Sequence, residues 1–382
     1  MLPTHEVEIM ATEAARPEYV KRVIPWVLIG RIALLVFFVL FLAVPLFNIL
    51  GQMFANPQLL LRQLIIGLTN GAYIALIALG YTLVYGIVEL INFAHGEVYM
   101  IGAFLSLTLV GLFGLTDKTP YITRIPLMFL ILFLTMLATA LLNAAIERFA
   151  YRRLRNAPRL APLISAIGVS FALQNVGLLW GYLRFPALHG VMGTNAVAPK
   201  SYPQLIPNDN LLAPLVGIFG ENFKVRMSIK DLVVIVISVT LLLALYTFVQ
   251  RTKIGKAMRA TAQDRSAAAL MGIDVNRTIT LAFLLGGALA GAAGMLVGMY
   301  NGTVVFTLGF TAGLRSFTAA VLGGIGNILG AMLGGLLIGL ISALSDQYIS
   351  AKWTNAVVFG LLVIILVFRP SGLLGEDVQQ KA

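Results

Sequence analysis

Apolar stretches long enough to cross a lipid bilayer dominate the chain. Their approximate bounds are 26–50, 60–88, 97–115, 125–148, 162–182, 230–250, 277–300, 317–345 and 354–369. A membrane-spanning helix needs about 20 such residues, and inside lipid only helices or closed barrels satisfy their backbone hydrogen bonds. With 59% hydrophobic and 11% charged residues, the composition is far from that of a soluble domain. The sequence therefore predicts an all-α, polytopic transmembrane helical bundle of about 8–10 spans, some of them short or broken.

Charged residues indicate how the spans are oriented. Two connections, "ERFAYRRLRNAPR" and "RTKIGKAMRATAQDR", are rich in arginine and lysine. Cytoplasmic loops collect these residues, so both connections are expected inside and the long 183–229 connection outside. The N-terminus is then cytoplasmic, whereas an inside C-terminus requires 301–320 to cross in a broken or short form. The net charge of +11 follows the same bias, so no nucleic-acid partner is expected.

Polarity also divides the chain into parts. Residues 1–25 contain several glutamates and predict a polar cytoplasmic tail rather than the basic start of a signal peptide. Residues 26–58 are expected to add one retained span and a linker. The main transmembrane domain is expected at 59–375, and a short C-terminal tail at 376–382.

Small residues recur at four-residue spacing along several spans. Four residues turn a helix by about 400°, so each set forms one stripe on which another backbone can approach closely. Packing within the subunit is favoured over a subunit interface. The candidate packing residues are Gly287, Gly291, Gly326, Gly330 and Gly334.

The stretch "INFAHGEVYMIGAF" (91–104) brings polar groups between two apolar spans. Ionisable groups at membrane depth are costly and usually functional. Two interpretations remain open: these residues cap and turn a hairpin, or they line the solute path at a broken helix. The candidate residues for the path or for helix breaks are Asn70, Glu89, Asn92, His95, Gly96, Glu97 and Arg315.

A second polar, glycine-interrupted segment echoes the first. Residues 309–321, "GFTAGLRSFTAAV", align with 92–104, "NFAHGEVYMIGAF", so that Gly96 matches Gly313. Paired interrupted helices mark the substrate path in transporters built from repeats. The identities are few, and a chance match remains an alternative.

Patterns typical of catalysis are missing from the sequence. "IGKAM" lacks the upstream glycine and the hydroxyl residue of a phosphate-binding loop. Only His5, His95 and His189 are histidines, and no cysteine occurs, so no metal site is expected. No catalytic residue is assigned, and transport is favoured over enzymatic activity.

The second basic connection also predicts a docking element. "GKAMRATAQD" favours a helix, and the following "SAAALMGI" favours a short amphipathic helix ended by glycine. Such a helix suits a groove on a soluble partner, although a solvated loop helix is the simpler alternative. The candidate residues of this loop (255–273) are Gly255, Arg259, Asp264, Ala267, Ala268 and Gly272.

Four long motifs resemble the membrane permease subunits of branched-chain amino acid ABC importers, in particular the shorter, H-type permease. They are "GYTLVYGIVELINFAHGEVYMIGAF", "LISAIGVSFALQN", "GKAMRATAQDRSAAALMGI" and "FTAAVLGGIGNILGAMLGGLLIG", and the resemblance covers about 60–375. It implies an ABC importer permease fold in the bacterial inner membrane and makes 255–273 the ATPase-coupling loop. Serine at 266 replaces the glutamate of the general coupling motif, and the first 58 residues and the long outer loop depart from the family.

The resemblance also implies the partners. They are a second, paralogous permease, two cytoplasmic ATP-binding subunits, an extracytoplasmic amino-acid-binding protein and membrane lipid. ATP would be used by those subunits, with no cofactor in this chain. Import of urea or short amides by a related permease is an alternative, and so is an ion-coupled secondary transporter or channel that uses Glu89 and Glu97.

Overall fold

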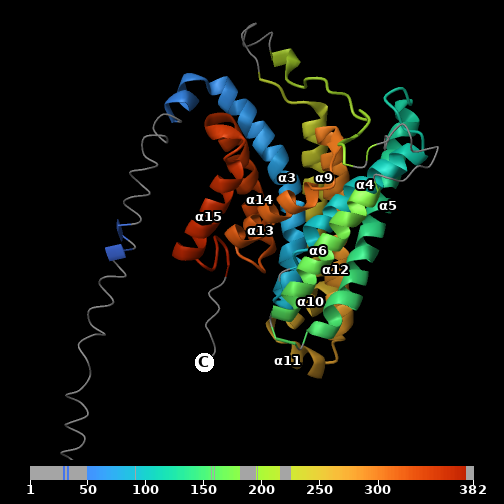
Figure 1. Cartoon of the computed structure of the whole chain (residues 1–382), viewed down its shortest axis with the longest axis vertical. Coiled ribbons are helices and arrows are strands. Elements are labelled where there is room, and N and C mark those ends of the chain that lie inside the picture. The colour runs from blue at the N-terminus through green and yellow to red at the C-terminus, as the bar shows by residue number, and fades with distance from the viewer. Residues whose placement is uncertain are drawn as a thin grey trace, which may run out of the picture. The chain divides into compact units, whose positions relative to one another are not determined.

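A computed structural model describes residues 29–30, 32–33, 50–90, 92–155, 157–158, 160–180, 195, 197–215 and 225–375 (Figure 1). The expected tails, 1–25 and 376–382, and most of the expected first span, 26–50, lie outside the described residues. Contacts divide the chain into two compact units, Met1–Pro57 and Gln58–Ala382. In the first unit, residues 50–55 are helical. The roles assigned to these parts from the sequence remain predictions.

The second unit consists almost entirely of helices. The longer ones are α3 (Pro57–Val88), α4 (His95–Leu112), α5 (Tyr121–Ile146), α6 (Leu160–Trp180), α9 (Ile229–Arg251), α12 (Val275–Asn301), α13 (Leu308–Gly323), α14 (Ile328–Ser345) and α15 (Thr354–Phe368). Two short helices, α10 (Lys253–Gln263) and α11 (Arg265–Leu270), join α9 to α12. Two π-helical turns, η1 (Glu147–Tyr151) and η5 (Asp346–Ser350), extend α5 and α14, and η2 (Arg152–Leu154) and η4 (Ala213–Leu215) are 3-10 turns.

Within the described part of the chain, seven helices are long and apolar enough to cross a membrane. They are α3, α4, α5 with its extension to Leu154, α6, α9, α12, and α14 with its extension to Ser350; α15 is apolar but shorter. The prediction of an all-helical, polytopic membrane bundle is confirmed.

Local sequence sets several helix starts. At α9, the Ser228 hydroxyl accepts a hydrogen bond from the Asp231 N–H, and the Asp231 carboxylate accepts one from the Ser228 N–H. Asp274 caps α12 and Asn327 caps α14 in a similar way. These side chains satisfy N–H groups that the first turn of a helix leaves without an internal partner.

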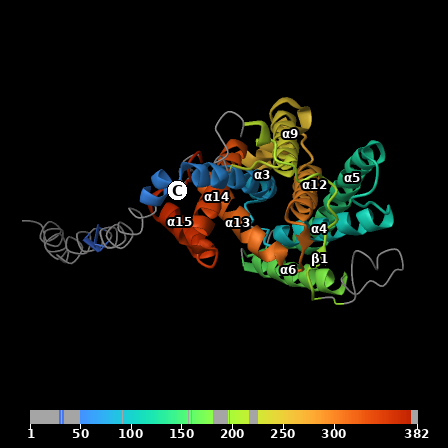
Figure 2. The same ribbon diagram turned by 90° about the horizontal axis from the view of Figure 1, so that it is seen from above.

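Helix α12 lies among α4, α5 and α9 (Figure 2), and its middle is buried. Gly287 faces Ala140 on α5, and Gly291 faces Thr139 on α5 as well as Gly102 on α4. A Cβ atom at either α12 glycine would overlap these neighbours. This stripe of small residues therefore packs within the chain and brings three helices close together.

The expected single span 317–345 is wrong. The structure divides it into α13 and α14, because Gly324 and Gly326 have φ values of 107° and 96°. These conformations are incompatible with a continuing right-handed helix and suit only glycine. Gly326 therefore lies in a turn and not on the helical stripe expected from the sequence, whereas Gly330 and Gly334 lie in α14.

The basic connections meet at one end of the bundle, where α10 and α11 lie (Figure 1). Arg155, which follows η2, donates a hydrogen bond to Asn276 near the start of α12 at 2.7 Å. Arg265 on α11 donates to the carbonyl of Ile87 near the end of α3 at 3.1 Å. The far end of α12 leads to strand β2 (Thr303–Val304), which pairs antiparallel with β1 (Lys200–Ser201) of the long connection. The two ends of the bundle thus differ in charge and in structure.

Candidate functional site

The connection between α3 and α4 folds back into the bundle. After Val88 the chain turns at Glu89, which has a φ of 53°. Helix α4 starts at His95, and a Cβ atom at Gly80 would overlap the His95 ring. Gly80 lies eight residues before Val88, so the start of α4 lies about 12 Å inside the end of α3, at a rise of 1.5 Å per residue.

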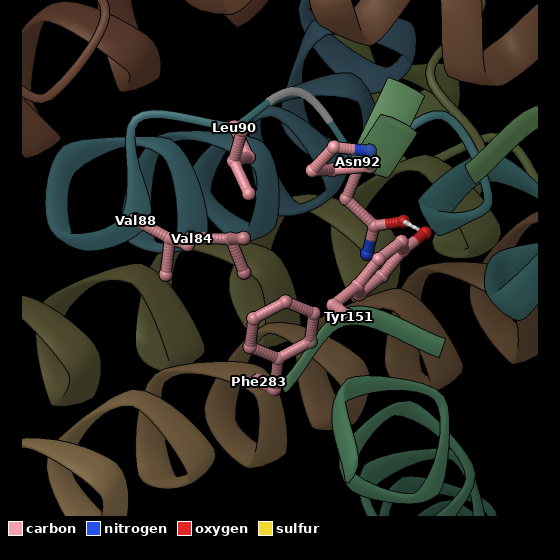
Figure 3. A pocket seen from close by; sticks show the side chains of 7 residues that line it. Val84, Val88, Leu90, Asn92, Tyr151 and Phe283 are labelled. Carbon is pink, nitrogen blue, oxygen red and sulfur yellow. Dashed lines mark hydrogen bonds between the residues drawn. The ribbon is translucent and has the colours of Figure 1, made fainter. Parts of the chain in front are cut away.

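Asn92 holds this turn together. Its side-chain oxygen accepts hydrogen bonds from the Tyr151 hydroxyl at 2.7 Å and from the Ala94 N–H at 3.1 Å. Its amide nitrogen lies 3.5 Å from the side-chain oxygen of Asn143 on α5. Figure 3 shows the Asn92 and Tyr151 side chains pointing toward each other. Asn92 therefore has a structural role that joins the turn to α5 and η1.

The pocket drawn in Figure 3 is too small for a solute. Asn92 and Tyr151 line it together with apolar side chains, among them Val84, Val88 and Phe283. Its volume is about 10 Å³. A cavity of that size has room for about one water molecule.

His95 is fully buried between α3 and α12. Its ring meets the Tyr81 ring edge-on, with centroids 4.9 Å apart and an angle of 73° between the planes. Neither ring nitrogen makes a hydrogen bond of normal geometry, although the backbone of Ile77 lies close by. The contacts of His95 are those of a packing residue rather than of a group that faces a cavity.

The starts of α4 and α13 meet inside the bundle. A Cβ atom at Gly96, the second residue of α4, would overlap the carbonyl oxygen of Gly309, the second residue of α13. Gly96 also lies against Gly313, its partner in the echo between the two polar segments. Both segments therefore begin helices at one place, as paired interrupted helices do in transporters.

A cavity of about 240 Å³ opens beside this meeting point. Helices α3, α4, α6 and α13 line it, together with Phe93 from the turn before α4. Most of the lining is aromatic or aliphatic, and the polar side chains are those of Tyr81, Glu97, Ser170 and Gln174. Ser170 lies half-way along α6, so the cavity lies near the middle of that helix, and the exposed side chains of Ile167, Phe171 and Phe310 form its open side.

Glu97 is the only carboxylate in the lining of this cavity. It lies in the first turn of α4 and is only 2% exposed. Ser170 offers the carboxylate a hydrogen bond, whereas its Oε2 atom lies against Gly309 and has no hydrogen-bond partner. Buried polar groups are normally satisfied, so this oxygen remains free to accept a further hydrogen bond.

The other candidate path residues do not line this cavity. Glu89 is exposed at the end of α3, and Asn70 is half-buried earlier on that helix. The guanidinium group of Arg315 donates two hydrogen bonds, at 2.9 and 2.7 Å, to the side-chain oxygen of Asn355 on α15. Glu89 and Glu97 are thus separated by the turn, one exposed and one buried.

Sequence reasoning missed Ser170 and Gln174. They lie one helical turn apart on α6 and line the same cavity. Polar residues at i and i+4 within the apolar stretch 162–182 were the available signal, because residues at that spacing share one face of a helix.

The expected coupling loop forms a pair of capped helices. Thr252 accepts a hydrogen bond from the N–H of Gly255 at the start of α10, and Arg259 donates to the carbonyl of Val249 on α9. The Asp264 carboxylate accepts from the N–H groups of Ser266 and Ala267 at 2.7 and 2.9 Å, which starts α11.

The residues at the end of α11 differ in how exposed they are. Ala268 is buried against the rest of the loop, whereas Leu270 and Met271 are 89% and 82% exposed. Gly272 follows with a φ of 82° and ends the helix, as the sequence pattern predicts for a C-terminal glycine. Two large apolar side chains are therefore presented at the basic end of the bundle.

Glu147 forms a charged cluster that the sequence did not reveal. Its fully buried carboxylate accepts hydrogen bonds from Arg152 at 3.1 and 3.2 Å, from Arg155, and from Thr280 on α12 at 2.9 Å. Burial lowers the pKa of Arg155, and the neighbouring Glu147 opposes that shift. This cluster ties the end of α5 to the start of α12. Its only sequence signal was one acidic residue beside a run of arginines.

Among the described residues, no group of three or more histidine, aspartate or glutamate side chains could hold a metal ion. The cavity, its single buried carboxylate and the loop helices are the site features that the described structure offers.

A multi-pass helical bundle with a cavity where two helices start inside the bundle has the architecture of a membrane transport protein. Residues 63–367 match the family model for the permease component of branched-chain amino acid transport systems, and the chain belongs to this family. It is therefore a transport protein rather than an enzyme. No solved structure was found to match it.

Several curated bacterial proteins are similar over most of their length. The chain is 42% identical over 327 residues to BraD of Pseudomonas aeruginosa, a high-affinity branched-chain amino acid transport system permease protein. It is 38% identical over 325 residues to the LivH proteins of Salmonella typhimurium and Escherichia coli, which carry the same description. Each comparison covers 84% of this chain and 97% of the relative.

Proposed function

We propose that this chain is the translocating subunit of an ATP-driven importer that carries leucine, isoleucine and valine across the bacterial inner membrane. The descriptions of the relatives support this solute class. A second, paralogous permease completes the pathway, and an extracytoplasmic binding protein delivers the amino acid to the outer face.

The observation that carries the ATP-driven mechanism is the exposed apolar pair at the tip of the loop. Leu270 and Met271 project beside basic α10, next to the turn at Gly272. Exposed apolar side chains on a short helix suit a groove on a soluble partner. Two cytoplasmic ATP-binding subunits would dock here and supply the ATP, so this chain needs no cofactor of its own.

The orientation follows from the same end of the bundle. Arg152, Arg155, Arg259 and Arg265 gather there, and cytoplasmic segments collect such charges. The N-terminus is then cytoplasmic, and the β1–β2 side faces the binding protein. Closure of the ATPases would move α10 and α11, which are hydrogen-bonded to α9 and α3.

The cavity favours a branched aliphatic solute over urea. Its walls include Ile167, Phe171, Phe310 and Phe317, and apolar surface is buried favourably only against an apolar group. Urea has no apolar group that could be buried against these side chains.

The test is leucine uptake in cells that lack their own branched-chain amino acid importers and co-express this chain with its partner subunits. Uptake should require ATP, stop when the ATPase subunits are inactivated, and be inhibited by excess isoleucine or valine. Uptake that continues with inactive ATPases would contradict the mechanism. Absence of leucine uptake, or uptake that is inhibited by excess urea but not by excess isoleucine or valine, would contradict the solute class.

A further inference from the structure

The cavity between α4, α6 and α13 contains one negative group in an otherwise uncharged lining. Glu97 is only 2% exposed, and its Oε2 atom has no hydrogen-bond partner. An unpaired buried charge is costly, so such a group requires a positively charged or hydrogen-donating partner. Among the cavity-lining residues none is basic. Ser170 offers the carboxylate a hydrogen bond but no positive charge, and an ammonium group that enters the cavity would supply that charge.

We propose that this cavity is a transit site for a zwitterionic aliphatic amino acid, whose ammonium group binds the Glu97 carboxylate; this assignment rests on the proposed function. The ammonium and carboxylate groups of an amino acid are attached to the same carbon atom. A cavity that binds both groups therefore needs a hydrogen-bond acceptor for the ammonium group and a hydrogen-bond donor for the carboxylate.

Two side chains on α6 complete the polar lining. Ser170 donates its hydroxyl hydrogen bond to the Glu97 carboxylate. Gln174 lies one helical turn further on, so its amide lines the same cavity and can donate a hydrogen bond. The amino acid's carboxylate binds Gln174, while its ammonium group points to Glu97 on α4.

The aliphatic side chain lies against the remaining wall. Phe171, Phe310 and Phe317 line the cavity, and its volume of about 240 Å³ is comparable with that of one leucine molecule. Helices α4 and α13 also point their N-terminal, positive ends at this place, which favours the negative charge of Glu97. Charge, donors and apolar surface together match a leucine-like zwitterion.

The test measures binding to the purified complex without its binding protein, so that the receptor does not select the ligand. Leucine is compared with 3-methylbutylamine, which lacks the carboxylate, and with 4-methylpentanoate, which lacks the amine. Titration calorimetry should detect leucine and, more weakly, the amine, but not 4-methylpentanoate. Leucine binding that is absent from the wild-type complex would overturn the assignment, as would equal binding of 4-methylpentanoate.

The decisive variant is Glu97→Gln, which keeps the size of the side chain and removes the charge. Affinity for leucine and for the amine should fall by about 10-fold or more, because a hydrogen bond to a charged group is lost. Asp117→Asn removes an exposed carboxylate from the α4–α5 turn and should change neither. Wild-type affinity for leucine in Glu97→Gln would refute the proposal.

A second variant covers the case in which Glu97→Gln does not fold. Gln174→Leu should weaken leucine binding and leave binding of 3-methylbutylamine unchanged; loss of neither or of both equally would count against the site. ATP-driven leucine uptake by the wild-type complex is measured in parallel. Intact uptake with the contrary binding result overturns only this site, whereas absent uptake overturns the proposed function.

Discussion

Single residues at the basic end of the bundle connect elements that lie far apart in sequence. Glu147 on η1 binds two arginines and, through Thr280, the start of α12. Tyr151, four residues later, donates its hydroxyl hydrogen bond to Asn92 in the α3–α4 turn. One turn of π-helix thus joins α12 to the segment that leads into α4. A substitution at these residues should therefore affect the packing of several helices.

We expect Glu147→Gln to destabilise the protein. The change leaves the Arg155 guanidinium, which is only 11% exposed, without its counter-charge. Breaking a buried ion pair on one side costs about 3–5 kcal/mol, and partial exposure of Arg152 should reduce the loss to roughly 2–3 kcal/mol. The measurement is thermal unfolding of the detergent-purified protein.

The matched control is Glu89→Gln, which changes an exposed carboxylate on the same side of the bundle. It should leave the melting temperature close to that of the wild type. A melting temperature of Glu147→Gln equal to that of the control would show that the cluster adds nothing to stability.

Among the helices, two starts and one end shape the candidate functional regions, which are the cavity and the loop tip. Helices α4 and α13 start together beside the cavity, and α11 ends at the exposed loop tip. The first arrangement depends on close contact of Gly96 with Gly309 and Gly313. The second depends on the left-handed conformation of Gly272.

We expect Gly272→Pro to uncouple ATP hydrolysis from transport. Proline fixes φ near −65°, whereas this position has a φ of 82°, so the end of α11 must rearrange. The residue is exposed in the turn before α12 and lies outside every span, so membrane insertion should persist. Hydrolysis and uptake are measured in the same proteoliposomes.

Gly272→Ala provides a graded comparison. Left-handed backbone costs an alanine roughly 1–2 kcal/mol, so its effect should be smaller and in the same direction. Uptake by Gly272→Pro at the wild-type rate would show that the end of α11 does not transmit the movement.

For the whole molecule, the asymmetry between the two ends of the bundle matters most. One end carries η1, η2, α10 and α11 with their arginines, and the other carries the α4–α5 turn and the β1–β2 pair. The proposed function requires the first end to face the ATPases. Orientation is therefore the property of the whole chain on which the mechanism depends.

Single cysteines can establish this orientation, because the chain contains no cysteine. Leu270→Cys, at a position 89% exposed on the loop tip, should react with a membrane-impermeant maleimide only after cells are opened. Asp117→Cys, in the turn at the other end of α5, should react in intact cells. Reaction of the loop tip in intact cells would contradict the proposed ATPase docking.

Sequence patterns predicted the helices well and the breaks less well. Apolar length alone located six of the seven spans within the described residues, because the bilayer imposes that length on any helix that crosses it. The break at Gly324 was missed, since small residues at four-residue spacing are equally compatible with a packed helix and with a turn. Only the observed φ values distinguish these two.

The candidate site was predicted in part. The stretch around Glu97 stood out because a carboxylate is rare between apolar spans, and Gly96 and Gly313 were matched by their spacing. Ser170 and Gln174 were missed, because a hydroxyl and an amide inside a span are more often satisfied by the helix itself. Glu89, Asn70 and Arg315 were included on polarity alone, and the structure places none of them at the cavity.

By itself, the sequence determined that the chain lies in a lipid bilayer, that its fold is a helical bundle, and where its basic segments lie along the chain. These properties depend on composition and on spacing along the chain. The tertiary structure alone decided that Glu97 faces a cavity while Glu89 does not, and that Glu147 pairs with two arginines. The physical reason is that the energy of a polar group in lipid depends on its neighbours in space. Those neighbours come from helices distant in sequence, and only their packing brings them together.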